Sequence, residues 1–305
     1  MTPHPPPPAR LKEAVPVEEA AATPPAHQPR TRRRPDRGPR RWEIYGPLAL
    51  YLLFTLIPFY WMLLYAFRPS TAKGLMPWPL TLQHLDDVWN GQGFGTYFLN
   101  SVKVGVTSML FTTVVAVLGG YALARYEFRG KRVFMVSLLC TQFIPGAMML
   151  IPLFEIFKHL SLVNSLWSVI IAESVFQLPL ALILISGFVR NVPVTLEEAA
   201  WVDGCTRLRG FLVTVLPLLR PGLIAVGSFA FIGAWNHFLF ALMFLSEQDK
   251  YTVPVGLSYQ IGDSGGVDVG ALAAGGVVAA VPVIFVFALI QRYIVKGLSA
   301  GAVKG

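Results

Sequence analysis

The segment RNVPVTLEEAAWVDGCTRLRGF, Arg190–Phe211, carries three acidic and three basic residues between two long apolar stretches. The 305-residue chain around it is 54% hydrophobic and only 14% charged. A soluble domain of this length carries about a quarter charged residues. We therefore expect an all-α membrane protein, in which this segment is a polar connection between two membrane-spanning helices.

Apolar windows of the length needed to cross a bilayer, about 20 residues, occur six times. The third window contains two prolines, which spanning helices tolerate when neighbours satisfy the freed backbone groups. The six predicted spans are residues 46–67, 101–123, 133–157, 166–188, 222–244 and 270–290.

Basic residues predict the orientation of these spans. Nine of the 25 Lys and Arg precede Trp42. Most of the others fall in residues 125–132 and 190–220 and at the C-terminal end. The positive-inside rule then predicts a multi-pass protein with both termini in the cytoplasm.

The N-terminal 41 residues differ in composition from the rest. They include PHPPPP and RTRRRPDRGPRR, with few residues that could build a core. A nucleic-acid-binding arm is one interpretation, but the apolar run that follows favours a basic anchor beside the membrane. We expect residues 1–41 to be a disordered cytoplasmic tail, residues 42–305 to form the membrane domain, and no nucleic acid to bind.

The charged segment has the pattern of two short helices joined by a turn. Thr195 followed by Glu198 is typical of a capping box, and Gly204 suits the left-handed residue that ends a helix. An apolar face is then predicted for the second helix. Its members are Leu208, Phe211, Leu212 and Val215.

This loop resembles the cytoplasmic loop of binding-protein-dependent ABC importer permeases. The resemblance lies in EAAWVDG and TVLPLLRPG, although Thr214 stands where the family usually has an aliphatic residue. The matching positions are Glu198, Ala199, Ala200, Asp203, Gly204, Leu216 and Pro217. The resemblance implies that residues 190–220 form a coupling loop that seats in a cleft of an ATPase. An amphipathic loop on the lipid surface is the other interpretation.

Two further stretches, AWNHFLFALMFLSEQDKYTVPVGL and QRYIVKGLSAGAVKG, are similar to the carbohydrate branch, especially the six-span maltose-type permease. The resemblance implies a type I importer fold, a place in the inner membrane of a bacterium or archaeon, and import of a sugar or oligosaccharide. It also implies four partners: a second, different permease, two cytoplasmic ATPases that hold ATP and Mg, and an extracytoplasmic solute-binding protein. A polyol or glycerol phosphate is the alternative solute, and a single-chain secondary transporter is the alternative mechanism.

Motifs for catalysis are weak or missing. The sequence has no GxxxxGK[ST] phosphate loop, so ATP hydrolysis is expected on a separate subunit. The histidines have no metalloprotease spacing. GDSGG, with Ser264 at the nucleophile position, lacks the surrounding strands that such a nucleophile needs, and a flexible turn is expected. We predict no catalytic residue, no metal site and no cofactor on this chain.

Polar residues inside predicted spans are candidates for the solute path, because they are costly in lipid and usually face a wet cavity or one another. Glu173 and Gln177 lie four residues apart on one helical face, and Asn236 lies beside two aromatic residues. They are predicted either to bind a hydroxyl-rich solute or to bond to one another within the helix packing.

Overall fold

The computed structural model describes residues 41–71, 78–91, 93–260 and 268–302. The chain divides into two units, residues 1–52 and 53–305. Of the first unit, the structure describes the helical residues 41–52, whose described side chains are exposed. The predicted tail before residue 41 and the stretch containing Ser264 lie outside the described residues.

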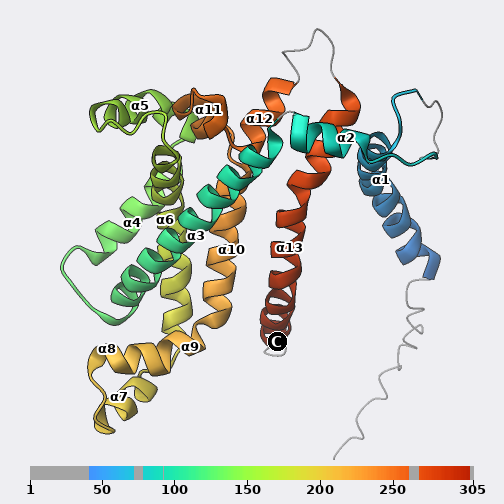
Figure 1. Cartoon of the computed structure of the whole chain (residues 1–305). Helices are drawn as coiled ribbons and strands as arrows, with labels where there is room; N and C mark the ends of the chain where they lie inside the picture. Colours follow the sequence, from blue (N-terminus) through green and yellow to red (C-terminus); the bar gives the residue numbers. More distant parts are fainter. Residues whose placement is uncertain (1–40, 72–77, 92, 261–267, 303–305) are drawn as a thin grey trace, which may run out of the picture. The chain divides into compact units, whose positions relative to one another are not determined.

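All regular secondary structure in these described ranges is helical (Figure 1). The first part contains α1 (Arg41–Phe67), α2 (Gln83–Asp86), the π-helix η1 (Asp87–Gly91), α3 (Phe94–Arg125), α4 (Lys131–Thr141), the 3₁₀ helix η2 (Gly146–Met149), α5 (Leu150–His159) and α6 (Leu166–Arg190). The second part contains α7 (Val194–Val202), α8 (Arg207–Gly210), the π-helix η3 (Phe211–Val215), α9 (Leu216–Leu218), α10 (Arg220–Asn236), α11 (Leu239–Phe244), the 3₁₀ helix η4 (Gln248–Lys250), α12 (Val253–Gln260) and α13 (Val269–Ala302).

Four helices, α1, α3, α6 and α13, are continuous and apolar enough to cross a membrane. They confirm the first, second, fourth and sixth predicted spans. The α4 helix and the η2–α5 pair could form one further span but are bent by 96°, and α8–α9 and α10 are bent by 76°. The structure therefore has between four and six candidate spans.

The predicted spans over 133–157 and 222–244 are broken helices in the structure. In the first window α4 ends at Thr141, and Pro145, which has no amide hydrogen, begins the turn of η2 with extended backbone. In the second window α10 ends at Asn236, and His237 is extended before α11 begins. Neither break follows from hydrophobicity, which stays high across both.

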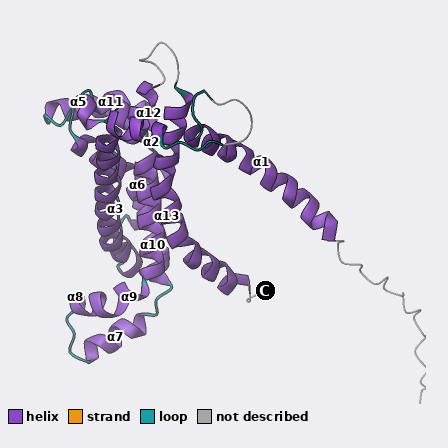
Figure 2. Ribbon diagram, turned by 45° about the vertical axis from the view of Figure 1, so that its right-hand side comes forward, coloured by secondary structure: helices purple, strands orange, loops and turns teal. Residues whose placement is uncertain are grey.

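Helices α3, α6 and α10 pack side by side in the second unit (Figure 1). At Gly120 of α3 an added Cβ would lie 2.7 Å from Cγ2 of Ile185, so only glycine permits this approach to α6. The α7–α9 segment lies at one end of these helices, and α5, α11 and α12 lie at the other (Figures 1 and 2).

Candidate functional site: a glycine-turned tip and its buried anchor

Helix α7 begins differently from the sequence prediction. Pro193 holds the position before the helix, and no side chain caps it. Thr195 lies inside the first turn, so the predicted capping box is wrong. The fixed φ of proline is already suited to a helix start, which allows α7 to begin one residue before Thr195.

Gly204 ends α7 as predicted, with φ +87°. Its amide donates to the carbonyl of Trp201 at 3.0 Å, and the amide of Cys205 donates to the carbonyl of Ala200 at 3.0 Å. This pair of bonds is a Schellman motif, which needs a left-handed residue at the glycine position. The turn satisfies the helix end and points the chain into α8.

The second short helix has a cap of its own. The hydroxyl of Thr206 accepts a hydrogen bond from the amide of Arg209 at 3.3 Å. The guanidinium of Arg207 lies 4.8 Å from the ring centre of Trp201, a cation–π contact that ties α8 back onto α7. The two helices therefore form one rigid tip, consisting of residues 194–210.

The exposed surface of this tip combines apolar and charged groups. Val202 is 87% exposed and Leu208 is 65% exposed. Exposed apolar side chains among charges are typical of a protein interaction surface. Among the predicted coupling residues, Glu198, Ala199, Asp203 and Gly204 are also exposed and Ala200 is half-buried.

Leu216 and Pro217, the other two predicted coupling residues, lie in α9, beside the 76° bend into α10. The predicted face of the second helix is also only half right, because Phe211 and Val215 are buried while Leu208 and Leu212 are exposed. The reason is η3, whose wider π-helical turn changes the spacing that faces inward.

The residue that holds the tip in place is Glu197, one position before the predicted Glu198. Its carboxylate is buried, with one oxygen 2.6 Å from Nε of Arg125 and the other accepting from the hydroxyl of Tyr121 at 2.7 Å. Arg125 also donates from Nη2 to the carbonyl of Val192 at 2.8 Å. The ring of Tyr121 packs edge-on against Phe211 at 4.7 Å. These contacts, called here the inner joint, fix α7 and η3 to the end of α3.

The sequence signal for this joint is faint. Tyr121 and Arg125 lie one helical turn apart at the end of a span, so both can reach one partner. Glu197 is 72 residues away from Arg125, and nothing in its local pattern distinguishes it from Glu198.

The predicted path residues lie in two different environments. Glu173 is buried, and its carboxylate lies 2.8 Å from Nδ1 of His237 and accepts from the amide of Gln177 at 3.4 Å. Asn236, at the end of α10, is exposed. Glu173 and Gln177 therefore bond to one another, as one of the two interpretations expected. His237, which sequence reasoning did not select, joins them from the break after α10.

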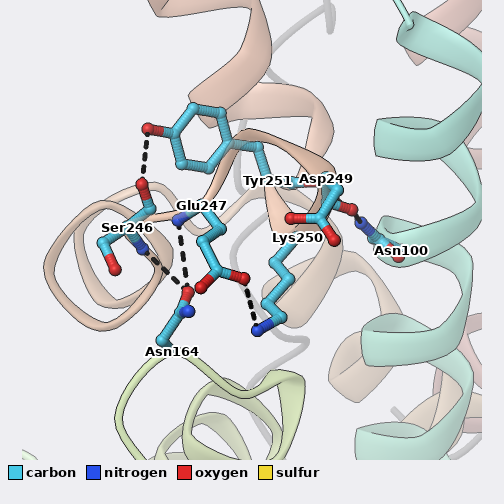
Figure 3. A network of polar contacts seen from close by, with 7 residues as sticks. All are labelled: Asn100, Asn164, Ser246, Glu247, Asp249, Lys250 and Tyr251. Atoms are coloured by element: carbon cyan, nitrogen blue, oxygen red, sulfur yellow. Dashed lines mark hydrogen bonds and ion pairs between the residues drawn. The ribbon is translucent and has the colours of Figure 1, made fainter.

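A second polar network lies at the other end of α3 (Figure 3). Nδ2 of Asn100 donates to the carbonyls of Asp249 at 2.8 Å and Tyr251 at 3.1 Å. The amide of Val253 donates to the hydroxyl of Ser101 at 2.8 Å. These bonds, called here the outer joint, attach the segment around η4 to α3.

The η4 segment is also held from the side of α5 and α6 (Figure 3). Oδ1 of Asn164 accepts from the amides of Ser246 and Glu247, each at 3.2 Å. Lys250 donates to the carboxylate of Glu247 at 2.7 Å, and this hydrogen bond lowers the pKa of Glu247 below its ordinary value. A cavity of about 620 Å³ adjoins the segment, lined by Gly91, Gly93, Thr96, Tyr97, Glu247, Gln248 and Asp249.

Relatives of known assignment are similar over nearly their whole length. The diacetylchitobiose uptake system permease protein DasC of Streptomyces coelicolor is 38% identical, and the match covers 87% of this chain and 98% of that protein. The trehalose transport system permease protein SugB of Mycobacterium tuberculosis is 33% identical, with 88% and 100% covered.

A solved structure shares the fold. A chain of a bacterial ABC transporter involved in the import of the acidic polysaccharide alginate superposes with a TM-score of 0.70 at 23% identity. The superposition covers 84% of this chain and 98% of that one. The likeness confirms the fold of an importer permease.

A match to a protein family covers most of the described helices and identifies the family of this chain. The family described as "binding-protein-dependent transport system inner membrane component" matches residues 116–300. The match includes the tip, the inner joint and the residues around Glu173. The chain belongs to this family, and it is a membrane permease subunit of an ABC importer rather than an enzyme.

Proposed function

We propose that this permease imports a sugar or an oligosaccharide, and that its glycine-turned tip couples transport to ATP hydrolysis. The observation that carries the coupling role is the inner joint, because a buried ion pair anchors an otherwise exposed tip to a spanning helix. The sugar assignment is supported by the relatives, which are named for diacetylchitobiose and trehalose. These names favour a sugar over the polyol or glycerol phosphate considered from the sequence.

The proposed assembly contains this chain, a second and different permease, two cytoplasmic ATPases that hold ATP and Mg, and a solute-binding protein outside. The family description, which names binding-protein-dependent transport, supports the last partner. The exposed Val202 and Leu208 support an ATPase as the partner of the tip, since both would be covered on docking.

The proposed orientation puts the tip and both termini in the cytoplasm and the η4 segment outside. It is supported by the arginines of the tip and of the loop before α4. In a chain lacking Cys140 and Cys205, single cysteines at Asp87 and Gly130 test it. An impermeant thiol reagent added to intact cells should label the first and not the second; the reverse pattern contradicts the orientation.

The proposed solute path runs along Asn236, with Gln177 and Glu173 behind it. An exposed amide at the end of a spanning helix is costly against lipid, so Asn236 is expected to face a wet cavity shared with the second permease. Glu173, on α6, would act indirectly by fixing His237 at the break after α10. Asn236→Ala should lower uptake while the assembled complex and its basal ATPase rate persist.

The function is tested with the whole complex reconstituted in vesicles. Trehalose, diacetylchitobiose, a polyol and glycerol phosphate are offered with the cognate binding protein, with and without ATP. ATP-dependent uptake of a sugar is the expected result. Uptake of the polyol or phosphate alone contradicts the sugar assignment, and uptake that persists without ATP contradicts the importer assembly.

A further inference from the structure

Helix α3 differs from the other long helices that the structure describes in having no proline inside it. Proline occurs within α1 at Pro47 and Pro58, within α6 at Pro179 and within α13 at Pro282. Proline removes a backbone hydrogen bond and permits a helix to bend. The 32 residues of α3 therefore form the long helix with the most complete hydrogen-bond ladder.

Near both ends of α3, buried polar side chains form hydrogen bonds to another segment of the chain. At the outer joint, Asn100 and Ser101 are 5% and 2% exposed, and they bond to backbone groups of Asp249, Tyr251 and Val253. Polar groups buried beside lipid are costly to leave unpaired, so these bonds are not readily exchanged for water.

At the inner joint the same helix holds α7. The Glu197 side chain is 2% exposed and that of Arg125 is 12% exposed. A carboxylate held by two donors from consecutive turns of α3, Tyr121 and Arg125, cannot rotate freely. A displacement of this end of α3 therefore carries α7 with it.

The two joints lie 25 residues apart along one helix, or about 37 Å at the ordinary helical rise. Two other elements reach the tip, α10 and α6. Helix α10 meets α8–α9 at a 76° bend and ends at Asn236, whereas α6 runs unbroken from Leu166 to Arg190. The α6 helix contains Pro179. Helix α3 is therefore the continuous and proline-free connection between the two joints, and its side chains make the buried polar bonds at both of them.

We propose that α3 is the strut through which docking of the loaded binding protein at the η4 segment reaches the ATPase-facing helix α7. Asn100 and Glu197 are its positioning residues, one at each end. The inference rests on the proposed function, because it presumes a binding protein outside and an ATPase inside.

The test compares basal ATPase activity with the activity stimulated by the loaded binding protein, in the complete complex in nanodiscs. Asn100→Ala and Glu197→Gln are each expected to lower the stimulation ratio at least about fivefold. The basal rate of Asn100→Ala, which lies far from the ATPase-facing tip, should stay within about twofold of the wild type. The double variant Asn100→Ala/Glu197→Gln should be no worse than the more severe single variant, because both interrupt one connection in series.

Matched control variants make the same type of substitution at residues outside the two joints. Asn90→Ala removes an exposed amide that bonds within its own helix turn, and Glu127→Gln removes an exposed carboxylate paired with Lys131. Both should keep the wild-type ratio. If Asn100→Ala or Glu197→Gln fails to assemble, the milder variants Ser101→Ala and Tyr121→Phe replace them. Each removes one hydrogen bond of the same joint and should lower the stimulation ratio by a smaller factor.

Three outcomes contradict the strut. In the first, the joint variants assemble and keep the wild-type stimulation ratio. In the second, the control variants lose the ratio as strongly as the joint variants. In the third, the loss of the ratio in the double variant equals the product of the two single losses. A wild-type complex that shows no stimulation at all would instead contradict the proposed function, so the two failures are distinguishable.

Discussion

The two ends of α3 are held by different chemistry. The inner joint joins two charged side chains and a phenol, whereas the outer joint joins a neutral amide and a hydroxyl to backbone groups. Backbone groups are present whatever the side chain, so the outer joint fixes the course of the η4 segment and leaves its side chains free. The inner joint depends on particular residues at both partners and fixes an orientation. The difference predicts that substitutions act more severely at the inner end.

The largest expected effect is at the tip that the inner joint supports. Gly204→Asp should lower uptake more than about tenfold, since a non-glycine residue at φ +87° costs about 1–2 kcal/mol and adds charge at the proposed docking surface. Uptake is measured per amount of chain in the membrane. Gly130 has φ +89° and open space around it, as Gly204 has, so Gly130→Asp is the matched control. Equal losses would show that backbone strain, and not the tip surface, is responsible.

The next effect breaks the inner joint itself. Glu197→Ala leaves Arg125 and Tyr121 without their acceptor and should cost about 2–3 kcal/mol, a buried-pair value reduced for the partial exposure of Arg125. Thermal unfolding of the purified chain in detergent measures the loss. The pair of Lys131 with Glu127, whose carboxylate is 87% exposed, should contribute about 0.5 kcal/mol or less. Comparable losses from Glu197→Ala and Glu127→Ala would remove the distinction between buried and exposed pairs.

At the outer end, Asn164→Ala should loosen the η4 segment. The change removes an acceptor for two backbone amides, worth about 1 kcal/mol each, and replaces a residue at φ +61°. Hydrogen exchange of the Ser246 and Glu247 amides should speed up by one to two orders of magnitude, about 10- to 100-fold at that energy. Asn164→Asp keeps the acceptor and should protect both amides; unprotected amides in Asn164→Asp would count against this bond as the constraint.

The smallest effect concerns the exposed pair of Glu247 and Lys250. The hydrogen bond from Lys250 lowers the pKa of Glu247, so the contribution of the pair is present at neutral pH and is lost as the pH falls through that lowered value. Lys250→Gln should raise the pKa of Glu247 toward its ordinary range and remove this small contribution to stability. NMR titration of a ¹³C-labelled Glu247 carboxyl measures it, and an unchanged titration midpoint would contradict the role of Lys250.

Sequence patterns predicted those features that depend on local chemistry. Gly204 was correctly predicted to be left-handed, because few other residues fit there, and long apolar windows identified the continuous spans. The capping box at Thr195 was wrong because Pro193 supplies an equally good local start. Pro193 and Thr195 are both favourable residues at a helix start, and the sequence pattern alone did not show which of them begins α7.

Features that depend on distant partners could not be predicted. Glu197 and Glu198 are adjacent and identical in type, and only the position of Arg125 in space distinguishes the buried one from the exposed one. His237 likewise gains its place from Glu173 on another helix. The π-helix η3 depends on packing against α3 and α6, which a count of helical spacing does not include.

The 96° bend after α4 has a consequence for the lipid around the chain. The 11 residues of α4 reach about 17 Å, roughly half the thickness of the hydrocarbon layer, before η2 and α5 turn aside. None of the α4 residues is buried within the described part of the chain. Where lipid covers this exposed face, the bilayer would meet a hydrophobic wall shorter than itself, and such a mismatch costs a fraction of a kcal/mol for each Å that is not covered. Membrane thickness would then act on α4, and lipids with shorter acyl chains would match its length with the least deformation.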